Sequence, residues 1–92
     1  MEYKENKEKN QPLKKIKAGA VSVTIWNNTA LGNNGELEEY NTVSIERSYK
    51  DKKGEWQKTN SFRINDLPKA VVALQQAFQH LVLQDDQQVI IK

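Results

Sequence analysis

Three segments in which apolar and polar residues alternate precede one segment with helical periodicity, and this order constrains the fold more than any other feature of the chain. In residues 19–26 every second side chain is apolar, namely Val21, Val23 and Ile25. Such alternation is typical of a β-strand with one buried face. Residues 40–50 and 55–64 alternate in the same way, and residues 14–17 are expected to form a short strand that leads into residues 19–26.

The fourth segment, residues 67–83, has apolar residues at spacings of three and four, which predicts an amphipathic helix. Its apolar stripe consists of Leu67, Val71, Leu74, Phe78 and Leu81, and it is widened by Ala70, Ala73 and Ala77. Asn65 and Asp66 can cap the start of this helix, and Pro68 fits its first turn. The order of segments predicts an α+β fold in which an antiparallel sheet of three to four strands is followed by one long C-terminal helix.

A single helix on a small sheet gives a thin core, and a domain of this size is often only marginally stable alone. Because association can complete such a core, we expect a homodimer. The residues expected at the dimer interface lie on the helix and are Val71, Leu74, Phe78, Leu81 and Val82.

The length of 92 residues indicates one domain, which we expect to span residues 13–84. Residues 1–12 are highly charged and are predicted to be a disordered tail, and residues 85–92 are predicted to be a C-terminal tail. Residues 27–39, which are rich in Asn and Gly, are predicted to be a long loop. The chain has no cysteine, no apolar run of membrane-spanning length and a polar N-terminus, so we expect an intracellular protein, cytoplasmic or nucleoid-associated, with no membrane partner.

The basic residues are concentrated in residues 47–63, which hold six Lys and Arg against Asp51 and Glu55 and carry a net charge of +4. The sequence DKKG at residues 51–54 is typical of a turn, and Gly54 suits a positive φ. A hairpin that pairs Lys50 with Glu55 would set Tyr49 opposite Trp56 on one face. The same register would also pair Arg47 with Lys58, Ile45 with Asn60 and Val43 with Phe62.

Two interpretations of Tyr49 and Trp56 remain open. The two rings can be a cross-strand pair that stabilises the hairpin, which contributes about 0.2–1 kcal/mol. They can also be a platform on which the bases of a single-stranded nucleic acid stack, each base contributing roughly 1–3 kcal/mol. Trp26, on the outward side of residues 19–26, can add a third ring or can pack beneath the adjacent loop.

No combination of residues indicates catalysis, so a non-enzymatic protein without a cofactor is expected. The one histidine, His80, falls near the C-terminal end of the predicted helix, where it complements the helix dipole. Without cysteine or a second histidine, a transition-metal site is not expected. The sequence GNNG is not followed by the Lys-Ser/Thr pair and helix of a phosphate-binding loop.

Several short motifs resemble the single-stranded DNA-binding domain of the positive cofactor four transcriptional coactivators, within the whirly-like group. They are the strand AVSVTIW, the strand VSIERSY, the turn DKKGE and the helix start IND, and the resemblance covers residues 13–83. It implies a curved antiparallel sheet followed by a helix, dimerisation largely through the helices, and single-strand binding across the sheet. It also implies that Tyr49 stacks on a base and that Lys58 and Arg63 contact phosphates.

The loop 27–39 is longer than in the eukaryotic coactivators, and QKTNSFR stands where they have a cluster of Gly, Arg and Lys. Residues 47–62 also resemble a hairpin of bacterial single-strand-binding proteins with the OB fold. A complete OB barrel needs five strands, and the sequence predicts three or four. We therefore favour the whirly-like fold, while both resemblances imply the same ligand.

Taken together, the residues predict sequence-tolerant binding of single-stranded DNA, or of RNA, in transcription or DNA maintenance. We expect phosphates along Lys15, Lys17, Arg47, Lys58 and Arg63, bases on Tyr49, Trp56 and Trp26, and salt-dependent attraction from Lys50, Lys52 and Lys53 at the hairpin tip. The alternative is a protein-interaction module that docks a protein partner through the helix and the C-terminal tail. A regulatory subunit of an enzyme is a third possibility.

Overall fold

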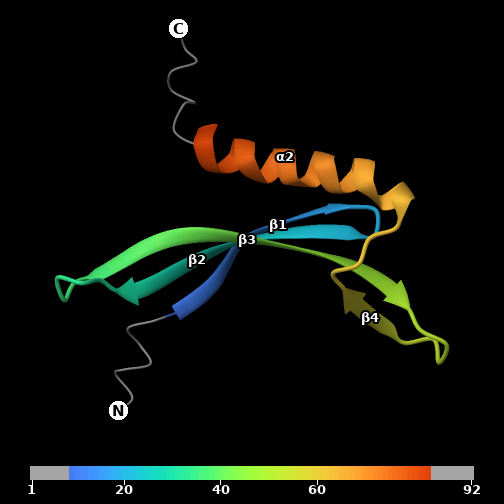
Figure 1. The fold of residues 1–92 in the computed structure, drawn as a ribbon, viewed down its shortest axis with the longest axis horizontal. Helices are drawn as coiled ribbons and strands as arrows, with labels where there is room; N and C mark the ends of the chain where they lie inside the picture. Colours follow the sequence, from blue (N-terminus) through green and yellow to red (C-terminus); the bar gives the residue numbers. More distant parts are fainter. Residues whose placement is uncertain (1–8, 84–92) are drawn as a thin grey trace, which may run out of the picture.

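A computed structural model describes residues 9–83 and has the predicted α+β architecture, with an open four-stranded antiparallel sheet followed by a helix (Figure 1). The strands are adjacent in chain order: β1 (Lys9–Ala18), β2 (Val21–Leu31), β3 (Leu37–Lys50) and β4 (Trp56–Thr59). A short 3-10 helix, η1 (Ile64–Asp66), leads into the long helix α2 (Leu67–Leu83). The predictions for residues 1–8 and for the C-terminal tail lie outside the described residues.

Several strand boundaries differ from the sequence-based expectations. The strand expected over residues 55–64 is shorter, because β4 ends at Thr59, so the expected pairs of Ile45 with Asn60 and Val43 with Phe62 do not form. Residues 9–12 belong to β1 and not to a disordered tail. Most of the predicted loop 27–39 is strand, because β2 and β3 continue as a hairpin with its turn at residues 32–36.

Asparagine side chains hold this unexpected part of the hairpin together. The Asn28 side-chain amide donates to the Thr42 hydroxyl at 3.0 Å and to the Tyr40 carbonyl at 3.4 Å. The Asn41 amide donates to the Trp26 carbonyl at 3.1 Å. Asn is depleted in strands because it competes for backbone hydrogen bonds, but here its amides bond across the strand pair and support it.

The sheet is curved (Figure 1). Figure 1 shows β3 arching beneath α2, with both of its ends bending away from the helix. The β2–β3 turn and the β3–β4 turn lie at opposite ends of the arch. One sheet face packs on α2, and the other, which we call the open face, lies on the side away from the helix.

The helix packs on the sheet through its alanines and not through the predicted stripe of large side chains. Ala70, Ala73 and Ala77 are buried on α2, and Ala73 and Ala77 form a core cluster with Val23 and Ile25 of β2. Alanine side chains let a helix approach a sheet closely, which leaves the larger residues on the outer side. Of the predicted stripe, Leu81 packs partly against the core, whereas Leu67, Val71, Leu74 and Phe78 are exposed.

The helix α2 contacts mainly β2 and β1, so it lies over one half of the sheet. Val43 of β3, on the helix side, remains exposed beside it. Among the described helices, none is both long and apolar enough to cross a membrane.

Candidate nucleic-acid interface

The two aromatic residues of the basic hairpin lie on opposite faces of the sheet, so the predicted pairing of Tyr49 with Trp56 is wrong. In the structure Tyr49 pairs with Gln57, and Lys50 pairs with Trp56. Directly paired residues point to the same face, and neighbours along a strand point to opposite faces. A register that differs by one residue therefore separates the two rings.

Asp51 sets this register by bonding to Glu55, the residue that was expected opposite Lys50. Its backbone N–H donates to the Glu55 carbonyl at 2.9 Å, and its carboxylate accepts the N–H groups of Lys53 and Glu55, each at 2.9 Å. These bonds lower the pKa of Asp51, the bond from Glu55 most. Gly54 has a φ of 84°, as its turn position predicted.

The open face brings together two tryptophans and several lysines. Strand pairing places Lys15 and Lys17 of β1 beside Thr24 and Ser22 of β2, and places Trp56 and Lys58 of β4 beside Lys50 and Ser48 of β3. Trp26 lies on the same face, where its indole N–H donates to the Ser44 hydroxyl at 2.9 Å. The open face is therefore assembled from all four strands.

Trp56 is the most accessible ring on this face, with 68% of its surface exposed. The Lys50 ammonium lies 5.5 Å from the ring centroid, within the range of a cation–π contact. Beside the ring is an open hollow of about 330 Å³, lined by Lys17, Ser48, Trp56, Gln57 and Lys58. This arrangement offers a flat ring face and two ammonium groups around a space large enough for a ligand.

Ser48, Gln57 and Glu46 belong to this site and were not predicted. The Glu46 carboxylate lies 3.2 Å from the Lys58 ammonium, which is therefore partly neutralised. The predicted register set Arg47 opposite Lys58, whereas in the structure Ser48 lies opposite Lys58.

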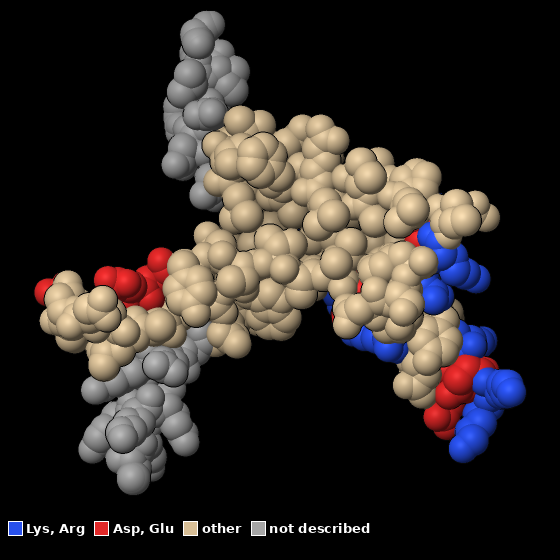
Figure 2. Space-filling model, in the orientation of Figure 1, with Lys and Arg blue, Asp and Glu red and all other residues tan. Residues whose placement is uncertain are grey.

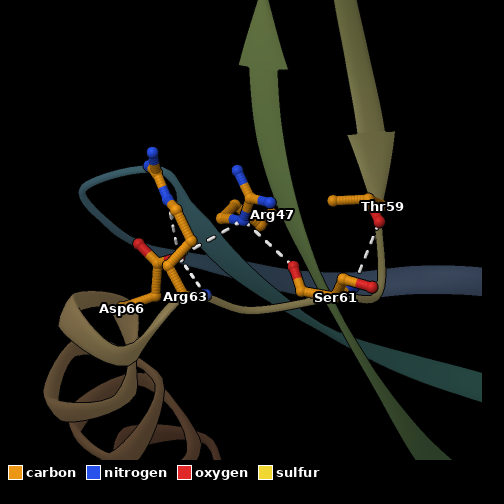
Figure 3. A network of polar contacts seen from close by, with 5 residues as sticks. All are labelled: Arg47, Thr59, Ser61, Arg63 and Asp66. Carbon is orange, nitrogen blue, oxygen red and sulfur yellow. Dashed lines mark hydrogen bonds and ion pairs between the residues drawn. The ribbon is translucent and has the colours of Figure 1, made fainter.

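Arg47, predicted to contact phosphate, lies on the helix side and is occupied by protein groups (Figure 3). Its Nε lies 3.2 Å from an Asp66 carboxylate oxygen and donates to the Ser61 carbonyl at 3.0 Å. Its side chain is 12% exposed. Arg47 thus ties β3 to the start of the helix, and its guanidinium lies 5.7 Å from the Tyr49 ring on the same face.

Asp66 is the centre of this network. It accepts the backbone N–H of Arg63 at 2.8 Å and also pairs with the Arg63 side chain at 3.5 Å. This backbone bond caps η1, whereas the sequence predicted Asn65 and Asp66 as caps of the long helix. The Arg63 backbone bond and the two arginine charges lower the pKa of Asp66. The Arg63 side chain is 70% exposed, so it is accessible to a ligand near the base of α2.

The charges divide between the two ends of the arch (Figure 2). Lys and Arg gather around the β3–β4 hairpin, where Lys52 and Lys53 are exposed in the turn. Glu36, Glu38 and Glu39 lie at the β2–β3 end. The basic end coincides with the hollow beside Trp56.

The described residues contain no group of three or more His, Cys, Asp or Glu side chains that is arranged to hold a metal ion. His80 lies in the last turn of α2. The open face presents aromatic rings, ammonium groups and hydroxyls. No family model, curated protein or solved structure shows significant similarity to the chain.

Proposed function

We propose that the open face binds single-stranded DNA or RNA with little sequence preference, in transcription or DNA maintenance. The observation that carries the proposal is the exposed Trp56 ring beside a hollow that Lys17 and Lys58 line. A base can stack on the ring while its phosphates lie against the lysines, which is how sequence-tolerant single-strand binders work. Trp26 supplies a second ring further along the same face.

The preference for single strands follows from the same geometry. In a duplex the bases are stacked on one another, so an indole ring has no free base face to contact. Single strands expose base faces and allow one ring to contact one base. Arg47 and Tyr49 lie on the other side of the sheet and are left out of the proposed contact surface.

We further propose that two copies of the chain form a homodimer through the outer side of α2. Val71, Phe78 and Val82 are about half exposed or more, and Leu74 is 40% exposed. α2 contains only one Lys, Arg, Asp or Glu residue, Lys69, and Figure 2 shows little charge around the helix. A contiguous apolar face of this kind is typical of a protein–protein contact, and a second copy would cover it while leaving both open faces accessible.

The test is fluorescence anisotropy of a labelled oligo-dT of about 20 nucleotides at low and moderate salt. We expect saturable binding that weakens steeply with salt, since released counterions contribute to affinity. We also expect that an excess of duplex DNA does not displace the bound oligo-dT. Absence of binding even at low salt would refute the proposal.

A protein-interaction module is the second candidate, and the uncharged outer side of α2 is the observation that favours it. In that case the basic hairpin only keeps the protein soluble. The oligonucleotide titration separates the two candidates, because this module would show no affinity for oligo-dT at any salt concentration.

A further inference from the structure

Among the strands of residues 9–83, none lies beside the outer edge of β3 along most of its length. β4 pairs with β3 only from Arg47 to Lys50, whereas β2 pairs with β3 from Leu37 to Arg47. Within residues 9–83, the edge from Leu37 to Glu46 is therefore not covered by any strand.

The direction of the exposed backbone groups follows from the hydrogen bonds at the covered end. The Ser48 N–H donates toward the β2 side, to Ala20, whereas the Ile45 carbonyl accepts the Asn60 side chain on the outer side. Successive residues in a strand alternate between the two sides, and the β2–β3 register has no irregularity. The N–H and C=O groups of Leu37, Glu39, Asn41 and Val43 thus point outward.

The opposite edge of the sheet, β1, is protected in ways that the β3 edge is not. β1 contains Pro12, an irregularity between Pro12 and Lys14, and three further lysines. Proline, bulges and lysines are the usual means by which proteins prevent an edge from pairing. The β3 edge has no proline, no bulge and exposed apolar side chains at Leu37 and Val43.

We propose that this edge pairs with the same edge of a second copy, as two antiparallel β3 strands related by a two-fold axis at Asn41. In this register Tyr40 faces the partner's Thr42 and Glu39 faces the partner's Val43. Leu37 faces the partner's Ile45, whose carbonyl already accepts the Asn60 side chain, so the hydrogen-bonded ladder ends before this pair. Moving the axis to Thr42 would set Leu37 opposite the partner's Arg47, whose outward groups are already paired with Thr59 in β4. The axis at Asn41 keeps β4 of both copies outside the ladder.

The arrangement is also compatible with the charges on the strand. Inside the ladder no two carboxylates face each other, and such like-charge pairs would be destabilising. At its ends Glu36 approaches the partner's Glu46, and the Lys58 ammonium lies 3.2 Å from Glu46 in each copy. The lysine therefore supplies positive charge where two carboxylates come close.

Edge pairing would join two four-stranded sheets into one sheet of eight strands and make the two open faces continuous. It uses a surface separate from the outer side of α2, so both contacts together would build a tetramer. The inference does not rest on nucleic-acid binding, and neither experiment below contains nucleic acid.

Hydrogen exchange followed by NMR on the full chain tests the edge directly. If a second copy covers it, the amides of Glu39, Asn41 and Val43 are protected at high protein concentration and lose protection on dilution. Rapid exchange of these amides at every concentration would overturn the inference. Protection that does not change with concentration would also overturn it, because a segment of the same chain would then lie on the edge.

The variant Asn41→Pro tests the same contact through the molar mass of the assembly in solution. Proline removes an N–H that points away from β2, so the backbone bonds of the β2–β3 ladder remain. The side-chain bond from Asn41 to the Trp26 carbonyl is lost. We expect Asn41→Pro to halve the mass measured by light scattering, and to halve it again when combined with Leu74→Lys on α2. An unchanged mass in a folded Asn41→Pro variant would overturn the inference; if this variant does not fold, the exchange experiment decides.

Discussion

Replacing Trp56 with alanine separates the two roles that this residue can have, because Tyr49 provides a matched control on the other face. Both residues lie near the end of the same hairpin, and each ring has a basic neighbour, at 5.5 Å for Trp56 and 5.7 Å for Tyr49. Trp56 faces the hollow and Tyr49 faces the helix side. Tyr49→Ala therefore repeats the loss of a hairpin aromatic without touching the proposed binding surface.

The expected losses of stability are small and similar. A cross-strand pair contributes about 0.2–1 kcal/mol, and an exposed cation–π contact contributes about 0.5–1 kcal/mol. A loss of about 1 kcal/mol would lower Tm by roughly 4–8 °C in a domain of this size. Neither variant is expected to unfold at room temperature.

The expected losses of affinity differ. Stacking of one base contributes roughly 1–3 kcal/mol, so Trp56→Ala should raise the Kd for oligo-dT by about 5- to 140-fold. Tyr49→Ala should leave the Kd within about twofold, since a residue outside the contact surface contributes little to affinity. Anisotropy titrations at one fixed salt concentration, with thermal melts of the same samples, measure both quantities.

Two results would refute this reasoning. If Trp56→Ala lowers Tm but leaves the Kd unchanged, the ring serves only the hairpin. If Tyr49→Ala weakens binding as much as Trp56→Ala does, the contact surface is not confined to the open face.

Three further predictions follow from the contacts. Glu46→Gln should tighten oligo-dT binding and steepen its salt dependence, because it releases Lys58 from its ion pair; unchanged titrations would contradict this. The pKa of Asp66 is lowered in the folded protein, so its stabilising contribution is present above the ordinary carboxyl pKa near 4 and is lost as the pH falls below it. Urea melts between pH 7 and pH 3 should therefore show a smaller decrease in the free energy of unfolding for Asp66→Asn than for the unmodified protein. Ala73→Leu should destabilise the fold by about 1–3 kcal/mol through overpacking, whereas Gln76→Leu on the exposed side of α2 should not.

The order of elements was predictable because it depends on local periodicity. Alternation in residues 19–26 identified β2 through Val21, Val23 and Ile25, which are fully buried. The spacing of apolar residues in 67–83 identified α2 with its observed bounds. Both patterns report which side chains avoid water, and this holds whatever the partner element is.

The length of the β2–β3 hairpin was not predictable from the same rules. Asn and Gly between residues 27 and 39 usually indicate a loop, and the strand is stable there because Asn28 and Asn41 bond across to a specific partner strand. Such bonds depend on which residues face each other, and local composition does not contain that information.

The sequence by itself determined the α+β order and the basic hairpin. It also placed one tryptophan, Trp56, in that hairpin and the other, Trp26, in the strand predicted over residues 19–26. Only the tertiary structure decided which rings share a face, because the turn closed by Asp51 displaces the register by one residue. It also decided that alanines and not the larger apolar residues face the sheet. The first outcome depends on the hydrogen bonds within one turn, where a displacement of one residue exchanges the two faces of a strand. The second depends on packing between segments that are distant in the chain.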